Sequence, residues 1–214
     1  VGLYGRILTI GDFDGNGSPD IAVSRASESI SGMTQAGSVD VHWGPNYSVR
    51  TVIANPTPAA GDFFGSRLVA FDVNGDGIDD LVEGSGRTAV GGLTMVGEIH
   101  VFLGPTLSLH STIPNPLGLN NARFAEGLHV ADLTGDGFAE IIAADVKNRL
   151  FIFWGPDWSA RSMQRRPPTP YQNPVGETVY GEKIASRDAN GDGSRDLASC
   201  DYFGGLVSGC QAGA

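Results

Sequence analysis

The residues best suited to chemistry lie in four acidic, glycine-rich segments. These begin at Asp12, Asp72, Asp132 and Asp188 and read DFDGNGSPD, DVNGDGIDD, DLTGDGFAE and DANGDGSRD. Oxygen-bearing side chains occupy the first, third, fifth and ninth positions of all four, and glycine occupies the fourth and sixth. A hard cation such as Ca²⁺ takes about six to eight oxygen ligands from carboxylates, amides and main-chain carbonyls. The segments therefore predict four cation-binding loops.

The glycines suit such loops because a tight turn needs residues that adopt positive φ without strain. The seventh position has no shared side-chain chemistry, so we assign it a main-chain carbonyl ligand. It is occupied by Ser18, Ile78, Phe138 and Ser194. Mg²⁺ is less expected than Ca²⁺ because it prefers few protein ligands and several waters.

Asx-turns, in which Asp and Asn bond their own backbone, are the structural alternative to a cation. They explain one such loop. They do not explain three carboxylates in each of four loops, which would repel one another without a cation. Residues 72–83 also match the EF-hand string, with Glu83 at its last position. We interpret that match as accidental, because an EF-hand needs a helix on each side and the flanking residues alternate as in strands.

The four segments belong to an internal repeat that must position them. Their first residues are 60, 60 and 56 positions apart. Eight residues before each segment lies an aromatic residue followed by glycine or alanine, and the first three copies later reach a Gly-Pro pair. The aromatic residues are Tyr4, Phe64, Phe124 and Tyr180. Repetition over the whole chain favours a repeat architecture.

Within a copy the hydrophobic pattern has the period of β-strands. Residues 6–10 lead into the first acidic segment, residues 21–23 leave it, and residues 38–43 alternate polar with apolar. Each copy therefore reads strand, acidic loop, strand, hairpin, strand, Gly-Pro turn, strand. A four-stranded antiparallel sheet per ~60 residues is the unit of a β-propeller blade.

We accordingly expect an all-β chain, a β-propeller or propeller segment of four four-stranded blades, the last one incomplete. Residues 1–214 would form a single repeat domain. The blades would span approximately 1–60, 61–120, 121–176 and 177–214.

The combination of an aromatic-Gly pair, a strand, D-x-[DN]-G-[DN]-G-x-x-D and a strand before Gly-Pro resembles the FG-GAP repeat of integrin α-subunit propellers. The resemblance implies an extracellular protein with one Ca²⁺ in each loop between the first two strands of a blade. The ligands it implies are Asp12, Asp14, Asn16, Ser18 and Asp20; Asp72, Asn74, Asp76, Ile78 and Asp80; Asp132, Thr134, Asp136, Phe138 and Glu140; and Asp188, Asn190, Asp192, Ser194 and Asp196. The third set departs most from the pattern.

Composition and charge limit the other functions. The formal net charge is −10, from 24 acidic and 14 basic residues, which argues against gripping nucleic acid. No run of 18 apolar residues predicts a membrane-spanning helix. Twelve of the 24 acids occupy ligand positions. Four divalent cations would add eight positive charges to the −10, leaving −2, so the acidity indicates calcium rather than a basic partner.

Three explanations of the four-copy count remain open. The chain is a fragment of a longer propeller, a four-bladed ring, or a protein whose blade edges pair with other chains or copies of itself. Cys200 and Cys210 are either free thiols or a cross-strand disulfide, which would favour an oxidising compartment. Together with the resemblance, the possible disulfide favours an extracellular or cell-surface location.

No catalytic constellation is evident. The histidines His42, His100, His110 and His129 are scattered, and no nucleophile elbow or phosphate-binding loop occurs. We expect a non-enzymatic structural or adhesion module. The alternatives are a glycan-binding lectin and an accessory domain of a secreted hydrolase. We expect Trp43 and Trp154 to pack between blades, which leaves Trp158 as the best candidate for an exposed contact with a sugar.

Overall fold

The computed structural model describes residues 4–165, 181, 183–193 and 195–200. Every regular element in these ranges is a β-strand, and no helix occurs among them. The prediction of an all-β chain is therefore confirmed. Within the same ranges no helix is long and apolar enough to cross a membrane.

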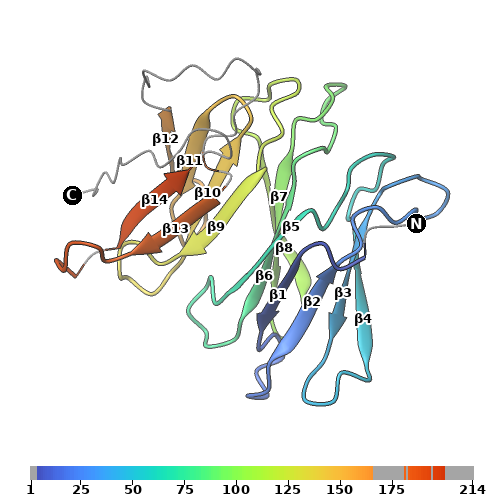
Figure 1. Cartoon of the computed structure of the whole chain (residues 1–214), viewed down its shortest axis with the longest axis horizontal. Helices are drawn as coiled ribbons and strands as arrows, with labels where there is room; N and C mark the ends of the chain where they lie inside the picture. The colour runs from blue at the N-terminus through green and yellow to red at the C-terminus, as the bar shows by residue number, and fades with distance from the viewer. Residues whose placement is uncertain (1–3, 166–180, 182, 194, 201–214) are drawn as a thin grey trace. The chain divides into compact units, whose positions relative to one another are not determined.

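Three successive antiparallel sheets have four strands each, in chain order across the sheet (Figure 1). The first sheet contains β1 (Leu8–Gly11), β2 (Asp20–Ser24), β3 (Ser38–His42) and β4 (Arg50–Ala54). The second contains β5 (Arg67–Phe71), β6 (Asp80–Ser85), β7 (Glu98–Leu103) and β8 (Ser108–Pro114). The third contains β9 (Gly127–Ala131), β10 (Glu140–Asp145), β11 (Arg149–Phe153) and β12 (Arg161–Arg165). We call these sheets blades one to three.

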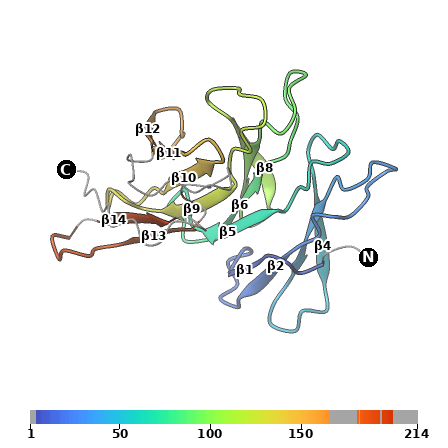
Figure 2. The ribbon, with the colours of Figure 1, turned by 45° about the horizontal axis from the view of Figure 1, so that its top comes forward.

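Blade four is described as one strand pair, β13 (Lys183–Arg187) with β14 (Asp196–Cys200). The order strand, acidic loop, strand, hairpin, strand, Gly-Pro turn, strand is confirmed in blades one to three. Figure 2 shows the strand pairs of the blades from a second direction. Tyr180, Ser194 and Cys210 lie outside the described residues, as does any partner strand for the edge of β14.

The contacts divide the chain into two compact units, which we describe separately. The first comprises Val1–Asp72 and Asp76–Ala125 and holds blades one and two; the second comprises Val73–Gly75 and Glu126–Ala214 and holds blades three and four. The core of the first unit lies between its two blades. It is built from Phe13, Ala22, Val39, Val41, Ile53, Phe64, Leu68, Leu81, Phe102 and Leu107.

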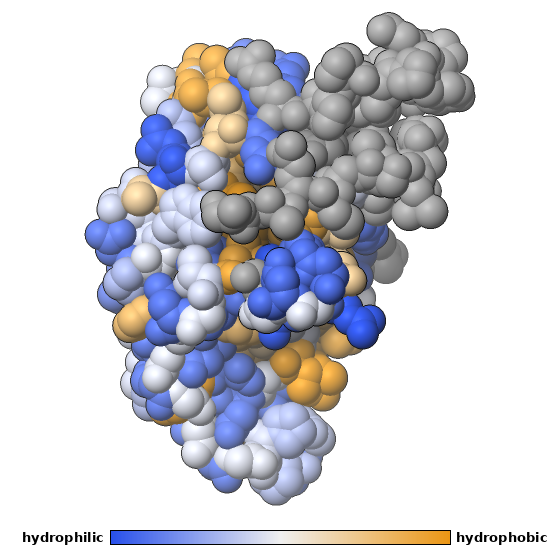
Figure 3. Space-filling model, turned by 90° about the vertical axis from the view of Figure 1, so that its left-hand side faces the viewer, coloured by the Kyte–Doolittle hydropathy of each residue, from blue (hydrophilic) through white to orange (hydrophobic). Residues whose placement is uncertain are grey.

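The second unit has a smaller core made by the alternate residues of β10 and β11, against which residues of blade four pack. It consists of Ile142, Ala144, Leu150 and Ile152, with Ile184 and Leu197 from β13 and β14 beside them. Figure 3 shows one side of the molecule, where hydrophobic residues (orange) occur in patches among hydrophilic ones (blue).

The aromatic residue of the repeat joins one blade to the next in the first unit. The Phe64 main-chain N–H donates to the Ala36 carbonyl over 3.1 Å, and the Phe64 side chain is fully buried. Gly37 pairs with Phe64 in a parallel bridge at a φ of 83°, and a Cβ there would lie 2.3 Å from the Phe64 carbonyl oxygen. Only glycine fits this approach. Phe124 repeats the arrangement, donating to the Val96 carbonyl over 3.0 Å.

Candidate metal sites

The four acidic loops join the first two strands of each blade, as predicted. In every blade the ninth loop residue pairs with the last residue of the preceding strand. These pairs are Gly11 with Asp20, Phe71 with Asp80, Ala131 with Glu140, and Arg187 with Asp196. The strand register therefore closes all four loops at the same point.

The ninth-position acids are buried and fixed by main-chain donors. Asp20 is fully buried and accepts hydrogen bonds from the main-chain N–H of Phe13 over 2.9 Å and of Gly44 over 2.7 Å. The second bond ties the loop to the Gly-Pro turn between β3 and β4. Asp80 accepts the corresponding bond from Gly104 over 2.9 Å. The position is thus part of the blade framework as well as a potential ligand.

Glu140 and Asp196 hold the same place in the second unit. Glu140 is 1% exposed and accepts from the Leu133 N–H over 2.7 Å. Asp196 is 7% exposed and accepts from the Ala189 N–H over 2.9 Å. The longer Glu140 side chain reaches the same second-position N–H that Asp20 and Asp196 reach in loops one and four, so the departure of loop three from the pattern at this position preserves the contact.

The carboxylate of each first-position aspartate accepts hydrogen bonds from main-chain N–H groups later in the same loop. Asp12 accepts from the Asn16 N–H over 3.0 Å and from the Gly17 N–H over 2.7 Å. In loop two the equivalent bonds run from Asp76 and Gly77 to Asp72. In loops three and four the donors are the fourth- and sixth-position glycines, Gly135 and Gly137 to Asp132 and Gly191 and Gly193 to Asp188. These bonds span three to five residues, and shorter Asx-turns such as that from Asn16 N–H to Asp14 add to them. Local side-chain-to-backbone hydrogen bonds therefore shape the loops in the absence of a cation.

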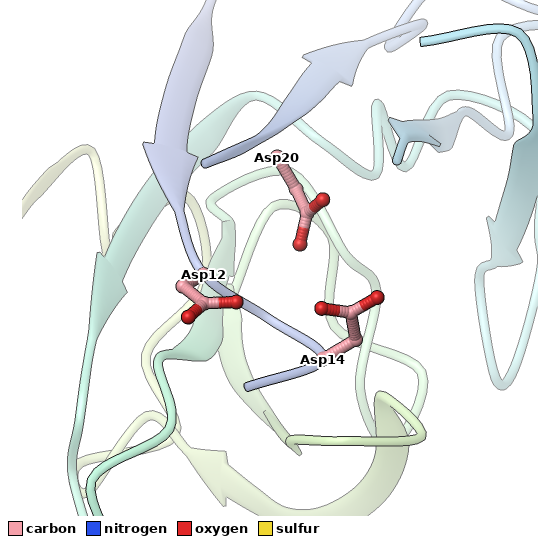
Figure 4. Close-up of side chains that lie close together, drawn as sticks. All are labelled: Asp12, Asp14 and Asp20. Carbon is pink, nitrogen blue, oxygen red and sulfur yellow. The ribbon is translucent and has the colours of Figure 1, made fainter. Parts of the chain in front are cut away.

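Loop one brings three carboxylates together. One oxygen each from Asp12, Asp14 and Asp20 lies within 4.8 Å of the others (Figure 4). Among the described residues this is the one group of three or more His, Cys, Asp or Glu side chains placed closely enough to hold a metal ion. The other loops carry Asn74, Thr134 or Asn190 at the third position. Their remaining carboxylate is at the fifth position, two residues later than Asp14 in loop one. The three oxygens of loop one point into a common space.

The carboxylates of loop one repel one another, which destabilises the folded loop unless a positive charge lies among them. Burial raises the pKa of Asp20, with the neighbouring Asp14 and Asp12 adding to the rise and the bonds from Gly44 and Phe13 opposing it. Burial likewise raises the pKa of Glu140, and Asp132 and Asp136 add to it. Both shifts reflect like charges held together out of water, which a bound cation would offset.

The seventh position offers no side-chain ligand in two of the loops. Ile78 and Phe138 each donate their main-chain N–H to the fifth-position aspartate, over 2.9 and 3.0 Å. The Ile78 side chain lies against Gly104. The main-chain carbonyl is the group left to bind a cation there. Carboxylates, amides, a hydroxyl and carbonyls make an all-oxygen donor set, which fits Ca²⁺.

The sequence did not predict a buried ionic cluster in the second and third strands of blade two. Glu83 is fully buried and its carboxylate lies 3.0 Å from His100 Nδ1, while Glu98 lies 3.3 Å from Nε2. Burial alone would lower the pKa of His100, but the two carboxylates outweigh it and raise the pKa to about 9. Glu83 and His100 are cross-strand neighbours on β6 and β7. That register is the one signal that could have paired them.

The prediction that Trp158 makes an exposed contact is wrong. Its side chain is 5% exposed, and its indole N–H donates to the Ala139 carbonyl over 3.0 Å. The residue follows the third Gly-Pro turn, and a main-chain bond to Trp154 at a φ of 54° turns it back onto the loop. Trp43 and Trp154 pack against the cores of their units, as predicted.

Comparison with known proteins gives relatives of two kinds. Integrin alpha-PS5 from Drosophila melanogaster is 32% identical over 148 residues, covering 64% of this chain and 15% of that protein. Integrin alpha-PS2 from the same organism is 27% identical over 222 residues, covering 92% of this chain and 15% of that protein. Human phosphatidylinositol-glycan-specific phospholipase D is 37% identical over 111 residues, covering 50% of this chain and 13% of that protein. The chain thus spans about a seventh of the length of these relatives.

No family model matches the chain. Among solved structures, the exotype rhamnogalacturonan lyase YesX superposes with a TM-score of 0.55 at 16% identity. The match covers 91% of this chain and 38% of the lyase. At that identity the likeness concerns the fold alone.

Proposed function

We propose that this chain, an FG-GAP repeat protein similar to the integrin α subunits, serves as a calcium-stabilised structural or adhesion module outside the cell. The observation that supports the proposal best is the convergence of Asp12, Asp14 and Asp20 on one space in loop one. The same strand register recurs in the other loops, and in each of them the first-position aspartate also accepts two main-chain hydrogen bonds. The proposed module carries out no catalysis itself.

Calcium would act by tying the first strand of each blade to the second. The first-position aspartate lies just after strand one, and the ninth-position acid opens strand two. A cation bound to both neutralises the repulsion between them and stabilises the folded state by mass action. Extracellular calcium modules have Kd values on the order of 10⁻⁴–10⁻³ M, which suffices outside cells.

Thermal unfolding with and without chelator tests this function. We expect EDTA to lower the Tm and an excess of Ca²⁺ to restore it, because Ca²⁺ binds the folded loops and not the unfolded chain. Mg²⁺ at the same concentration is the control and should restore less, because it dehydrates reluctantly and prefers fewer protein ligands. A Tm that is unchanged by EDTA and by added Ca²⁺ would overturn the proposal.

Adhesion is supported by an apolar face of blade one. Leu8 on β1 is 56% exposed, whereas Leu68, the same residue at the same repeat position in blade two, is 8% exposed. Tyr4 and Phe64 show the same contrast, 58% against 0%. Blade one covers the face of blade two that contains Leu68 and Phe64. We propose that the matching face of blade one binds a protein partner of the same kind, a further blade or a second copy.

Sedimentation velocity at increasing concentration tests the self-association form of this proposal. Leu8→Lys should abolish any dimer, and Leu93→Lys, which changes an exposed leucine in the β6–β7 loop, is the matched control. A dimer that survives Leu8→Lys would exclude this face.

Glycan binding is the second candidate function, and one cavity favours it. A cavity of about 570 Å³ on blade one is lined by Tyr4, Arg25, Asp40, His42 and Arg50, among others. Tyr4 is 58% exposed beside this cavity, and the charged side chains of Arg25 and Arg50 line it. The guanidinium groups of Arg25 and Arg50, which pair with Asp40 Oδ2 over 3.3 and 2.9 Å, would donate to sugar hydroxyls while a sugar ring stacks on Tyr4. Binding on a glycan array that Tyr4→Ala abolishes and Tyr47→Ala preserves would favour this function.

A further inference from the structure

We infer that loops one and two are coupled cation sites and that Asp79 carries the coupling. The inference rests on the proposed function, since it concerns how two of the proposed sites influence each other. Asp79 is the eighth residue of loop two and precedes Asp80, the buried ninth-position acid. Asp12 is the first ligand position of loop one.

Asp79 holds the main chain of Asp12 from both sides. Its carboxylate Oδ2 accepts the Asp12 N–H over 2.9 Å, and its own N–H donates to the Asp12 carbonyl over 3.1 Å. The Asp12 side chain meanwhile closes loop one through Asn16 and Gly17. The residue that organises site one is therefore fixed by a residue of loop two.

A second contact joins the same loops. A Cβ placed on Gly15 would lie 3.1 Å from the Ile78 side chain, so the two loops are packed together at this point. Ile78 is the seventh position of loop two, whose carbonyl we assign to the cation. Positions seven and eight of loop two thus both rest on loop one.

We call the two hydrogen bonds between Asp79 and Asp12 the Asp79–Asp12 clamp. Its side-chain bond is particular to loop two. The eighth residues of loops one, three and four are Pro19, Ala139 and Arg195. None of these carries a carboxylate. Ala139 makes a similar main-chain bond, but it donates to the carbonyl of Val73, the second residue of loop two, over 3.1 Å.

Ordering is the physical basis of the coupling. A cation at site two fixes Asp80 and therefore the adjacent Asp79, so less conformational entropy remains to be lost when Asp12 binds a cation at site one. Linkage makes the effect reciprocal. We expect Ca²⁺ at site two to tighten site one by about fivefold, the lower end of coupling between allosteric sites.

Electrostatics alone predicts the opposite sign. The three ligand carboxylates of loop two and a bound Ca²⁺ sum to −1, whereas Asp76→Ala, with two carboxylates and no Ca²⁺, leaves −2. A more negative neighbour would tighten site one. Loss of site two should instead weaken site one if the clamp is the coupling element.

Site-resolved calcium titrations by NMR test the inference. The amides of Gly15 and Gly17 report site one, and that of Gly77 reports site two. As a single substitution, Asp76→Ala should weaken Ca²⁺ binding at site one about fivefold. In an Asp79→Ala background, which has the residue found in loop three, the same change should shift site one less than twofold. Asp79→Asn keeps an oxygen acceptor, so the coupling should persist in it.

Each outcome decides between the claims. If none of these amides shifts with Ca²⁺, the proposed function fails and the coupling fails with it. If both loops titrate but Asp76→Ala leaves site one unchanged or tighter, the coupling alone is wrong. Loss of coupling in Asp79→Asn as well as in Asp79→Ala would show that the carboxylate charge, not the hydrogen bond, links the sites.

Discussion

Replacing the repeat's aromatic residue by alanine should destabilise the fold strongly in blade two and hardly at all in blade one. Phe64 is fully buried, with its ring centroid 5.5 Å from that of His100 and 6.1 Å from that of Phe102. Tyr4 holds the same position in blade one and is 58% exposed. Truncating a buried Phe to Ala typically costs about 3–5 kcal/mol, because the lost apolar burial is compounded by the cavity left behind.

We therefore expect Phe64→Ala to lower the free energy of unfolding by about 3–5 kcal/mol. Tyr4→Ala should change it by less than about 0.5 kcal/mol, as is usual at exposed positions. Urea unfolding followed by circular dichroism measures both, at saturating Ca²⁺ so that cation loss does not contribute. The midpoint should shift while the m-value stays constant, since the change is one of stability. Equal losses in the two variants would refute the assignment of Phe64 to the interblade core.

Three further predictions concern other residues. Because the raised pKa of His100 favours its protonated form in the fold, its stabilisation should be complete below about pH 6.5 and lost as the pH rises through about 9; the difference in unfolding free energy between wild type and His100→Gln should shrink over that range. Trp158→Phe should cost about 1 kcal/mol in urea unfolding through loss of the bond to Ala139, and a loss indistinguishable from zero would show that the bond contributes nothing. Gly37→Ala should be strongly destabilising because its Cβ would overlap the Phe64 carbonyl, whereas Gly32→Ala, at a similar φ but in open space, should cost only the backbone strain; similar losses in the two would contradict the packing argument.

The arrangement of strands and loops could be predicted because local chemistry and global fold agree. The alternation in the strands, the positive-φ glycines of the loops and the Gly-Pro turns all indicate the same repeat. The role of the first-position aspartates could be predicted from the local sequence, because their hydrogen bonds reach residues no more than five positions away. The position of Gly44 beside Asp20 depends on sheet register and follows once the strand order is known.

The features that escaped prediction depend on contacts between distant residues. Trp158 holds the repeat position of Tyr47 and Leu107, three residues after the glycine of each Gly-Pro turn and at positive φ in all three copies. Because the residue type differs in each copy, the pattern did not show that the Trp158 indole donates to the Ala139 carbonyl. Glu83 and His100 each looked isolated along the chain, and only the pairing of β6 with β7 brings them together. The clamp between Asp79 and Asp12 joins residues 67 positions apart and needs the packing of one blade on the next.

Calcium titration of the chelator-stripped chain by isothermal titration calorimetry tests the central claim most directly. The account predicts saturable binding of up to four Ca²⁺ per chain, one for each loop. Asp14→Ala, which removes an acid of the loop-one cluster and leaves the buried framework acids in place, should abolish one binding event. Absence of calcium binding in the wild-type chain, or a stoichiometry unchanged by Asp14→Ala, would contradict it.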